Sequence, residues 1–477
     1  MGKNAPRNVL AERYASDEMV AIWSPAHKIV LERKLWIAAM HTFRSLELER
    51  DIPLDAIKAY EATINDVNLE SIAHREARLR HDVKAHIEEF NSLASQHIGR
   101  SVQYIHEGFT SRDPTDNTEQ LQIFRSIQLV RDRTVALLSR LGSSMAQYET
   151  TDICGRSHLV PAQTTTLGKR FANIAEELLT GFERLEHLIG VYAMRGIKGP
   201  MGTQQDILSI LKTPEKIRCF EFEMRKRLGF PRTLESTGQV YPRSLDFEVV
   251  SRLCQLGSPL GNMATMVRLM AGLDLMHEGF GEEQTGSSAM PHKVNSRTCE
   301  RVCSLLDVLC GYQDMVSRLL GHQWLEGDVS CSVIRRVALP DSFFAIDGMI
   351  ESAMTVLGEM EIFPGAIQAE LERYLPFLST TALLMYAVQK GMGREDAHAV
   401  IKKAALEALE HMREGGSNLF LSYLSDNEFF PWSETQRIAS EANHGLAVEQ
   451  TKAVLIRIQE IIKKYPDAAK YAPAPIL

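Results

Sequence analysis

The feature of this 477-residue chain that most constrains its fold is the spacing of its prolines. Proline is absent from residues 54–113, 162–199 and 292–339. Because proline removes a backbone donor and clashes with the preceding turn, stretches without it leave room for long helices. Within the last two stretches, apolar residues recur every three or four positions, at Ile174, Leu178, Leu179, Phe182, Leu185 and Leu188, and at Val302, Leu305, Leu306, Leu309, Tyr312, Val316, Leu319 and Leu320. That spacing marks one face of a helix, so the pattern predicts long helices that pack together.

The sequence gives no evidence for a β-sheet fold, because it contains no series of alternating, β-branched segments with hairpin turns. The sequence therefore predicts an all-α fold with a bundle of long helices at its centre. A chain of 477 residues exceeds one compact core, and its loops suggest three helical domains, at residues 1–112, 113–364 and 365–477. Helices with wide apolar faces need partners, and periodicity leaves open whether these belong to the same chain or to another copy.

Composition and charge argue against several classes of protein. The chain has 53 basic and 61 acidic residues and a formal net charge of −8, whereas nucleic-acid binders usually carry a basic excess. The sequence contains no run of 18 apolar residues, so it predicts no membrane helix. Its N-terminus lacks the apolar core of a signal peptide. Seven cysteines without a CxxC pair are typical of reduced thiols. We therefore expect a cytoplasmic protein that binds neither nucleic acid nor membrane.

The sequence lacks the common motifs for metals and redox cofactors. The partial GxG at 391–393 has neither the third glycine nor the preceding strand of a dinucleotide-binding fingerprint. No Walker A loop and no HExxH pair occur, and His81 and His86 are five residues apart rather than the four of a helical zinc pair. The sequence therefore predicts no metal site and no cofactor.

One segment, GSSAMPHKVN at residues 286–295, has the composition of a binding loop. Glycines at positions 279 and 281 lead into it, and a long predicted helix follows it. A helix N-terminus binds anions because its free N–H groups and its dipole are positive, and Lys293 and Asn295 add a cation and an amide. By composition alone, the segment is either such an anion site or a polar surface loop with a helix cap.

The same segment resembles the signature of the fumarase/aspartase superfamily, G-S-S-x-M-P-x-K-x-N, at every specified position. Members of that superfamily eliminate or add across a bond next to a carboxylate. Further segments are similar to the adenylosuccinate lyase family in particular, at 13–16, 80–83, 110–113, 155–170, 198–204 and 238–243. The resemblance extends from Arg13 to Arg394 and so covers nearly the whole chain.

The resemblance implies a β-elimination in purine biosynthesis that releases fumarate from adenylosuccinate, giving AMP, and from the ribotide SAICAR, giving AICAR. It assigns Ser287 as the base that removes a proton and His158 as the acid that protonates the leaving nitrogen. Glu300 matches the acidic partner that orients His158, and Lys293 and Asn295 match the groups that hold the succinyl carboxylate. Because a serine hydroxyl is a very weak acid, Ser287 is expected to need Lys293 and backbone N–H groups for its activation. Without the resemblance, each of these candidate catalytic residues would be interpreted as an ordinary loop or surface residue.

The resemblance also implies a set of substrate contacts. The phosphate and ribose contacts of the family correspond to Arg13, Tyr14, Arg80, His81, Asp82, Arg301, Ser332 and Arg336. The contacts with the succinyl part or the ring correspond to Thr110, Ser111, Gln204 and Gln239. Arginine binds phosphate well, although a lone arginine would be read as a surface ion pair. The anionic Asp82 is expected to orient His81 or to meet the ribose.

One position departs from the family pattern. Many members carry an arginine near the position of Gly327, and glycine cannot supply that charge. Three alternatives stand: another residue such as Arg335 takes its place, the phosphate is held differently here, or the alignment slips by one or two residues.

In this superfamily, active sites combine segments from three subunits, so the resemblance implies a homotetramer of D2 symmetry with shared sites. Three other hypotheses compete with a nucleotide lyase. The first is another superfamily member such as argininosuccinate lyase or a cycloisomerase, but segments 80–82 and 203–204 favour the nucleotide substrate. The second is a catalytically silent structural protein, and the third is a nucleotide-binding regulator. The presence of all four candidate catalytic residues argues against both.

Overall fold

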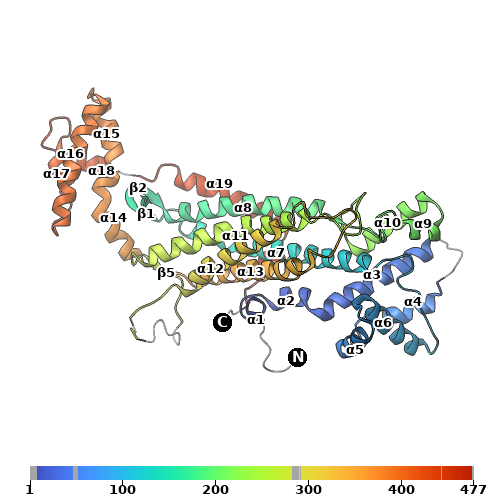
Figure 1. Cartoon of the computed structure of the whole chain (residues 1–477). Helices are drawn as coiled ribbons and strands as arrows, with labels where there is room; N and C mark the ends of the chain where they lie inside the picture. Colours follow the sequence, from blue (N-terminus) through green and yellow to red (C-terminus); the bar gives the residue numbers. More distant parts are fainter. Residues whose placement is uncertain (1–7, 47–51, 282–288, 291, 442, 475–477) are drawn as a thin grey trace.

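The computed structural model describes residues 8–46, 52–281, 289–290, 292–441 and 443–474. Within these residues the chain consists mostly of helices, with a few short strands (Figure 1). The expectation of an all-α fold is therefore confirmed. No helix in this part of the chain is long and apolar enough to span a membrane.

Long helices form the central bundle in Figure 1: α7 (Arg112–Gln147), α8 (Leu167–Val191), α11 (Ser244–Ala271), α12 (Arg297–Ser317) and α13 (Ser332–Glu359). The two apolar stripes read from the sequence fall on α8 and α12. Helix α12 packs against α11 and α13, and α7 packs against α8 and α13. Their shared core contains fully buried side chains such as Leu138 and Phe343, so burial of apolar surface holds the bundle together.

The first two N-terminal helices lie along the bundle, and the next four lie beside one end of it (Figure 1). They are α1 (Val9–Arg13), α2 (Asp17–Trp23), α3 (Pro25–Ser45), α4 (Leu54–Ala62), α5 (Leu69–Leu79) and α6 (Asp82–Ile98). A second apolar cluster forms around Trp36 and Phe90. Helices α9 (Gln205–Leu211) and α10 (Pro214–Leu228) complete it. Because α3 also packs along α7, it connects this cluster to the bundle.

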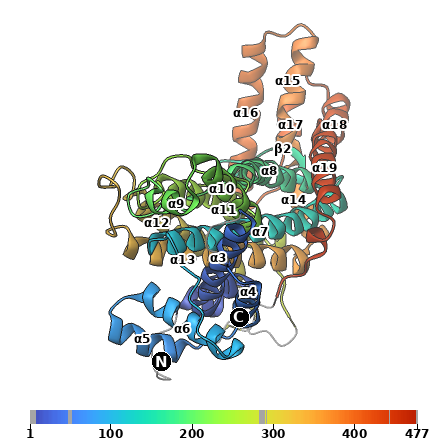
Figure 2. The same ribbon diagram turned by 90° about the vertical axis from the view of Figure 1, so that its right-hand side faces the viewer.

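The C-terminal helices project from the opposite end (Figures 1 and 2). They are α14 (Pro364–Leu378), α15 (Thr380–Gln389), α16 (Arg394–Arg413), α17 (Phe420–Leu424) and α18 (Trp432–Ser440). They enclose a further apolar cluster that contains Phe420 and Phe430. The last long helix, α19 (Ala447–Lys464), returns along α7 and α8, and a 3₁₀ turn follows at Ala468–Lys470. The domain boundaries at residues 112 and 364 remain a prediction.

One hairpin interrupts the helical pattern. Strands β1 (Asp152–Ser157) and β2 (Val160–Thr166) pair antiparallel between α7 and α8. Both residues of the turn, His158 and Leu159, have positive φ angles, of 52° and 62°, as the tight turns of hairpins require. The other strands are two residues long: β3 (Ala193–Met194) with β4 (Arg232–Thr233), and β5 (Met276–His277) with β6 (Glu361–Ile362).

Candidate active site

A cavity of about 320 Å³ lies where α7 begins; we call it the α7 pocket. Its lining comes from helices α3, α6, α7 and α13 and from the segment before α13. The lining residues are Lys28, His81, Asp82, Val83, Ser111, Arg112, Thr115, Glu119, Val329, Ser332, Arg335 and Arg336. Five of them, His81, Asp82, Ser111, Ser332 and Arg336, are substrate contacts predicted from the sequence. The fold thus gathers residues from three distant parts of the sequence at one cavity.

Two helix N-termini meet at the α7 pocket. Helix α7 starts after Ser111, whose side chain makes no capping hydrogen bond. Helix α6 starts after His81, whose Nδ1 accepts the N–H of Lys84 at 3.3 Å. Nδ1 is therefore the acceptor, which leaves Nε2 for a ligand. The carboxylate of Asp82 lies 3.5 Å from His81, and both side chains are half exposed. Helix N-termini favour anions, so this arrangement suits a phosphate.

Two acids hold Arg335: the buried Asp246 and the partly buried Glu119, which lines the pocket. Its guanidinium donates to Asp246 at 2.8 Å and to Glu119 at 2.6 Å. Glu119 also pairs with Lys28 at 3.1 Å. Burial would raise the pKa of Glu119, but the charges of Arg335 and Lys28 lower it well below its usual range. Arg335 is therefore a structural cation whose charge is already balanced.

Arg336 differs from its neighbour, because it lines the same pocket but is exposed. No described residue forms an ion pair or hydrogen bond with its guanidinium. Among the described residues it is therefore the arginine of the α7 pocket best able to pair with a ligand phosphate.

The departure at Gly327 has a structural reason. Gly327 has a φ of +134°, and a Cβ atom there would lie 2.9 Å from Cγ2 of Val240. A side chain at this position would be strained in the backbone and crowded by its neighbour. This conformation therefore suits glycine at 327 and disfavours an arginine there.

Replacing Arg336 with glutamine is expected to raise KM for a phosphorylated substrate by roughly 10- to 100-fold with little change in kcat, because a hydrogen bond to a charged group contributes about 1.5–3 kcal/mol. Steady-state kinetics measure both constants. Arg413→Gln, an exposed arginine of α16, serves as the matched control and should leave KM unchanged. An unchanged KM in Arg336→Gln would remove Arg336 from the phosphate site.

A second group of predicted residues lies at the start of α12. The guanidinium of Arg301 stacks over the ring of Tyr14, 5.6 Å from its centroid, and Arg13 precedes Tyr14 on the exposed side of α1. Lys293 is exposed in the segment that leads into α12, and Asn295 follows it half-buried. The predicted base, Ser287, lies outside the described residues.

Sequence reasoning missed the residue that anchors this segment. Glu278 is buried, and its carboxylate accepts the N–H groups of Thr298 and Cys299, each at 2.8 Å. It therefore caps α12 in place of a local N-cap side chain, since Ser296 makes no side-chain capping bond. Only the glutamate's place shortly before the signature segment could have suggested this role.

His158 occupies the tip of the β1–β2 hairpin, where its side chain is exposed. The hairpin is fixed by Arg156, which pairs with Glu370 of α14 and donates to the carbonyl of Leu159 at 2.8 Å. Among the described residues, no hydrogen bond or ion pair joins His158 to Glu300, which is exposed in the first turn of α12. The predicted orienting contact is thus not formed within one chain.

The hairpin and the α7 pocket lie at opposite ends of α7. This helix has 36 residues, and at about 1.5 Å per residue it is roughly 54 Å long. Figure 1 shows the hairpin at one end of the bundle and α5 and α6 at the other. His158 of one chain therefore cannot reach a ligand in the α7 pocket of the same chain.

The remaining substrate contacts predicted from the sequence lie around the N-terminus of α7. Thr110 donates its N–H to Asp113 at 2.7 Å, and Arg80 ends α5 in a left-handed conformation with its side chain exposed. The amide nitrogen of Gln204 donates to the carbonyl of Ile197 and to Glu221, both at 2.9 Å. The backbone of Gln239 donates to the carbonyl of Glu326 at 2.5 Å. These contacts hold the loops around the α7 N-terminus in place.

A buried carboxylate that the sequence did not single out organises these loops. One oxygen of Asp113 accepts from Arg195 at 2.6 Å and from the N–H groups of Lys198 and Gly199 at 2.9 and 3.1 Å. Asp113 and Arg195 are both fully buried. The pair thereby fixes segment 195–199 against the start of α7.

Comparison with known proteins agrees with this architecture. The family description "Lyase" matches residues 13–311, and "Adenylosuccinate lyase C-terminus" matches residues 376–451. Adenylosuccinate lyase of Saccharomyces cerevisiae is 31% identical over 89% of this chain and 88% of its own length. That of Schistosoma mansoni is 31% identical over 97% of this chain and 96% of its own.

Solved structures share the fold at lower identity. The 3-carboxy-cis,cis-muconate lactonizing enzyme of Pseudomonas putida superimposes with a TM-score of 0.81 at 18% identity, over 95% of this chain and 99% of its own. The fumarate lyase of Mesorhizobium sp. BNC1 gives a TM-score of 0.78, also at 18% identity, over 94% and 99% of the two chains. Together with the sequence matches, the bundle and its signature segment place the chain in the adenylosuccinate lyase family of the fumarase/aspartase superfamily, and it is a lyase.

Proposed function

We propose that this lyase eliminates fumarate from adenylosuccinate, giving AMP, and from SAICAR, giving AICAR. The observation that carries the proposal is the α7 pocket, in which His81, Ser111, Ser332 and Arg336 meet at two helix N-termini. Such a pocket suits a nucleotide phosphate and ribose. The relatives named adenylosuccinate lyase, which match nearly the whole chain, support the same substrates.

The proposed chemistry divides the elimination among four side chains. Ser287 takes the proton from the carbon beside a succinyl carboxylate, and the electron pair is held as an aci-carboxylate by Lys293. The pair then forms the new C=C bond as the C–N bond breaks, and His158 protonates the leaving nitrogen. Glu300 orients His158. Fumarate and the amino nucleotide leave, and His158 regains the proton that Ser287 took, so no cofactor or metal is consumed.

The separation of the hairpin from the α7 pocket supports a shared site. Since roughly 54 Å of helix lies between them in one chain, a complete site needs His158 from another copy. We propose a homotetramer of D2 symmetry, in which long bundle helices of several subunits pack side by side and bring their opposite ends together. A cytoplasmic location remains a prediction.

The proposal is tested by incubating the purified protein with adenylosuccinate. We expect AMP and fumarate in equal amounts, separated by chromatography and followed by ultraviolet absorbance. Argininosuccinate serves as the competing substrate and should not react. A folded tetramer that cleaves argininosuccinate, or that cleaves neither compound, would refute the proposed substrate specificity.

A further inference from the structure

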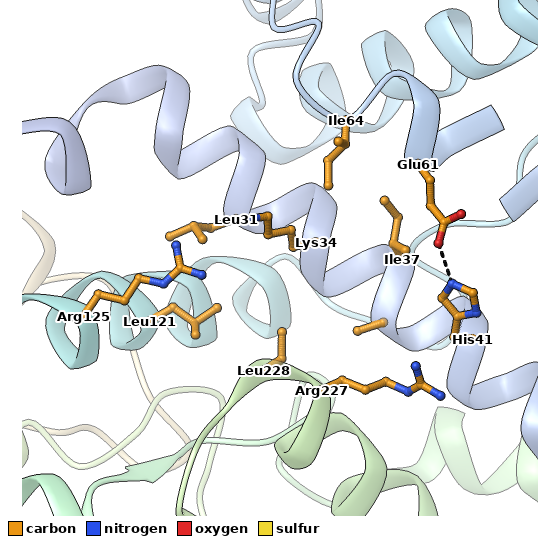
Figure 3. A pocket seen from close by; sticks show the side chains of 11 residues that line it. Leu31, Lys34, Ile37, His41, Glu61, Ile64, Leu121, Arg125, Arg227 and Leu228 are labelled. Atoms are coloured by element: carbon orange, nitrogen blue, oxygen red, sulfur yellow. Dashed lines mark hydrogen bonds and ion pairs between the residues drawn. The ribbon is translucent and has the colours of Figure 1, made fainter. Parts of the chain in front are cut away.

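A second cavity lies outside the residues assigned to catalysis (Figure 3). Its volume is about 470 Å³, larger than that of the α7 pocket. It opens between helices α3, α4, α7 and α10, and we call it the α3–α10 cavity. A volume of this size accommodates a small organic molecule.

One part of the α3–α10 cavity is apolar. Leu31 and Ile37 of α3, Leu121 of α7 and Leu228 of α10 form this surface (Figure 3). Leu31, Ile37 and Leu121 are buried, so they are fixed in the core on one side and face the cavity on the other. The surface is therefore suited to the apolar body of a ligand.

Three cations surround this apolar surface: Lys34, Arg125 and Arg227. Among the described residues, Lys34 and Arg227 form no hydrogen bond or ion pair. Arg125 donates to the imidazole of His27 at 3.0 Å. Since imidazole carries no negative charge, this bond does not neutralise Arg125. The acid at the cavity, Glu61, is already bonded to His41 at 2.7 Å (Figure 3). Within the described part of the chain, the cavity therefore has an excess of positive charge without counterions.

Burial and nearby like charges together lower the pKa of two neighbouring titratable groups. Burial lowers the pKa of Lys34, and the charge of Arg125 lowers it further. Burial also lowers the pKa of His27, and Arg125 and Lys34 add to the effect. Repulsion between like charges lowers the pKa of a cationic group, and a bound anion would relieve that repulsion. In a chain with a net charge of −8, such a cluster is not explained by an overall basic surface.

We propose that the α3–α10 cavity binds a small organic anion with a carboxylate or phosphate at one end and an apolar body at the other. The cations would pair with the anionic group, and the leucine and isoleucine side chains would cover the body. The cavity is separate from the α7 pocket. Lys34 follows Lys28 of that pocket by six residues on α3, and Arg125 follows Glu119 by six on α7, which corresponds to about 9 Å along each helix. The proposal does not depend on the catalytic function.

Binding of four probes to the full-length protein tests the inference by titration calorimetry. Phenyl phosphate and benzoate carry both an anion and an apolar ring, and they distinguish a phosphate site from a carboxylate site. Benzyl alcohol lacks the charge, and inorganic phosphate lacks the ring. We expect one of the first two probes to bind with a Kd below about 5 mM, a modest affinity for a ligand of this size, and the last two to bind at least about tenfold more weakly.

Variants locate the binding site. The double variant Lys34→Gln/Arg227→Gln changes two exposed side chains, so folding should be unaffected, and it should weaken binding by about tenfold or more. Lys226→Gln, at the exposed position beside Arg227, is the matched control and should bind like the unaltered protein. Arg336→Gln reports on the α7 pocket and should leave binding at the α3–α10 cavity unchanged. Absence of binding by both anions, equal binding of benzyl alcohol, or a loss that follows Arg336→Gln in place of the double variant would overturn the inference.

Discussion

Replacing His158 is expected to lower kcat for adenylosuccinate by about 10³-fold, because a positioned general acid contributes roughly 10²–10⁴ to the rate. KM should change little, since the acid acts on the leaving nitrogen as the bond breaks. The fold should survive, because the side chain is exposed at the hairpin tip. His158→Asn is the most informative substitution, since asparagine tolerates the positive φ of the turn but cannot deliver a proton. Steady-state kinetics and gel filtration measure the two effects.

The matched control for this variant is Leu159→Asn, which alters the other positive-φ residue of the same turn. It should keep most of the activity, because Leu159 is 62% exposed and has no assigned chemical role. Equal losses in both variants would mean that the turn, and not the imidazole, is required. More than about a tenth of the unaltered kcat in His158→Asn would contradict the role of general acid.

The largest expected effect on stability comes from the pair of Asp113 and Arg195. Replacing Asp113 with asparagine leaves the fully buried guanidinium of Arg195 without its counter-charge, and breaking a buried pair in this way costs about 3–5 kcal/mol. The thermal midpoint should therefore fall by several degrees at fixed protein concentration, which matters because assembly contributes to the midpoint. Segment 195–199 should also loosen, since Asp113 accepts its N–H groups.

Asp55→Asn is the matched control, because it breaks an Asp–Arg pair of the same chemistry that lies on the surface. Asp55 contacts Arg100 at 2.8 and 2.9 Å, but solvent surrounds both groups. Exposed pairs contribute little because water and salt screen them. The control should leave the midpoint unchanged, and a drop in Asp113→Asn no larger than that of Asp55→Asn would refute the structural role of the buried pair.

The bundle was predictable where local pattern and packing agree. The apolar stripes of α8 and α12 fall in proline-free stretches, and both are helices. The proline criterion could not find α11 and α13, because Pro259 and Pro340 lie inside them. A proline inside a helix costs about 3 kcal/mol locally, and the many buried contacts of these two helices outweigh that cost. Local sequence does not contain this information.

The β1–β2 hairpin was not predictable for a different reason. A tight hairpin turn usually shows Asn-Gly or a related pair, which adopts positive φ at low cost. Here His158 and Leu159 occupy those positions, so the usual turn signal is missing. The candidate acid was recognised from its family segment, while the element that presents it was found only in the structure.

Individual residues of the candidate site could be predicted from the sequence, but their arrangement in space could not. The family resemblance identified His81, Ser111 and Arg336, and the fold brings these together in the α7 pocket. Two buried acids, Asp113 and Glu278, were missed because a charged residue in a sequence is usually read as exposed. Their roles depend on N–H groups from distant segments.

In the proposed tetramer, one active site uses opposite ends of different chains, and mixing two defective variants tests this arrangement. The first variant, His158→Ala, lacks the proposed acid of the hairpin, and the second, His81→Ala/Arg336→Ala, lacks two groups of the α7 pocket. Each homotetramer should be nearly inactive at low substrate concentration. After subunit exchange in equal proportions, each site draws its hairpin and its pocket from independent subunits, so about a quarter of the sites should hold both intact parts.

Exchange is followed with a charge tag on one variant, separated by ion-exchange chromatography. We predict that activity rises from near zero toward about a quarter of that of the unaltered enzyme as mixed tetramers form. Mixed tetramers that remain as inactive as their parents would rule out a shared site, because both intact parts would then have to come from the same chain.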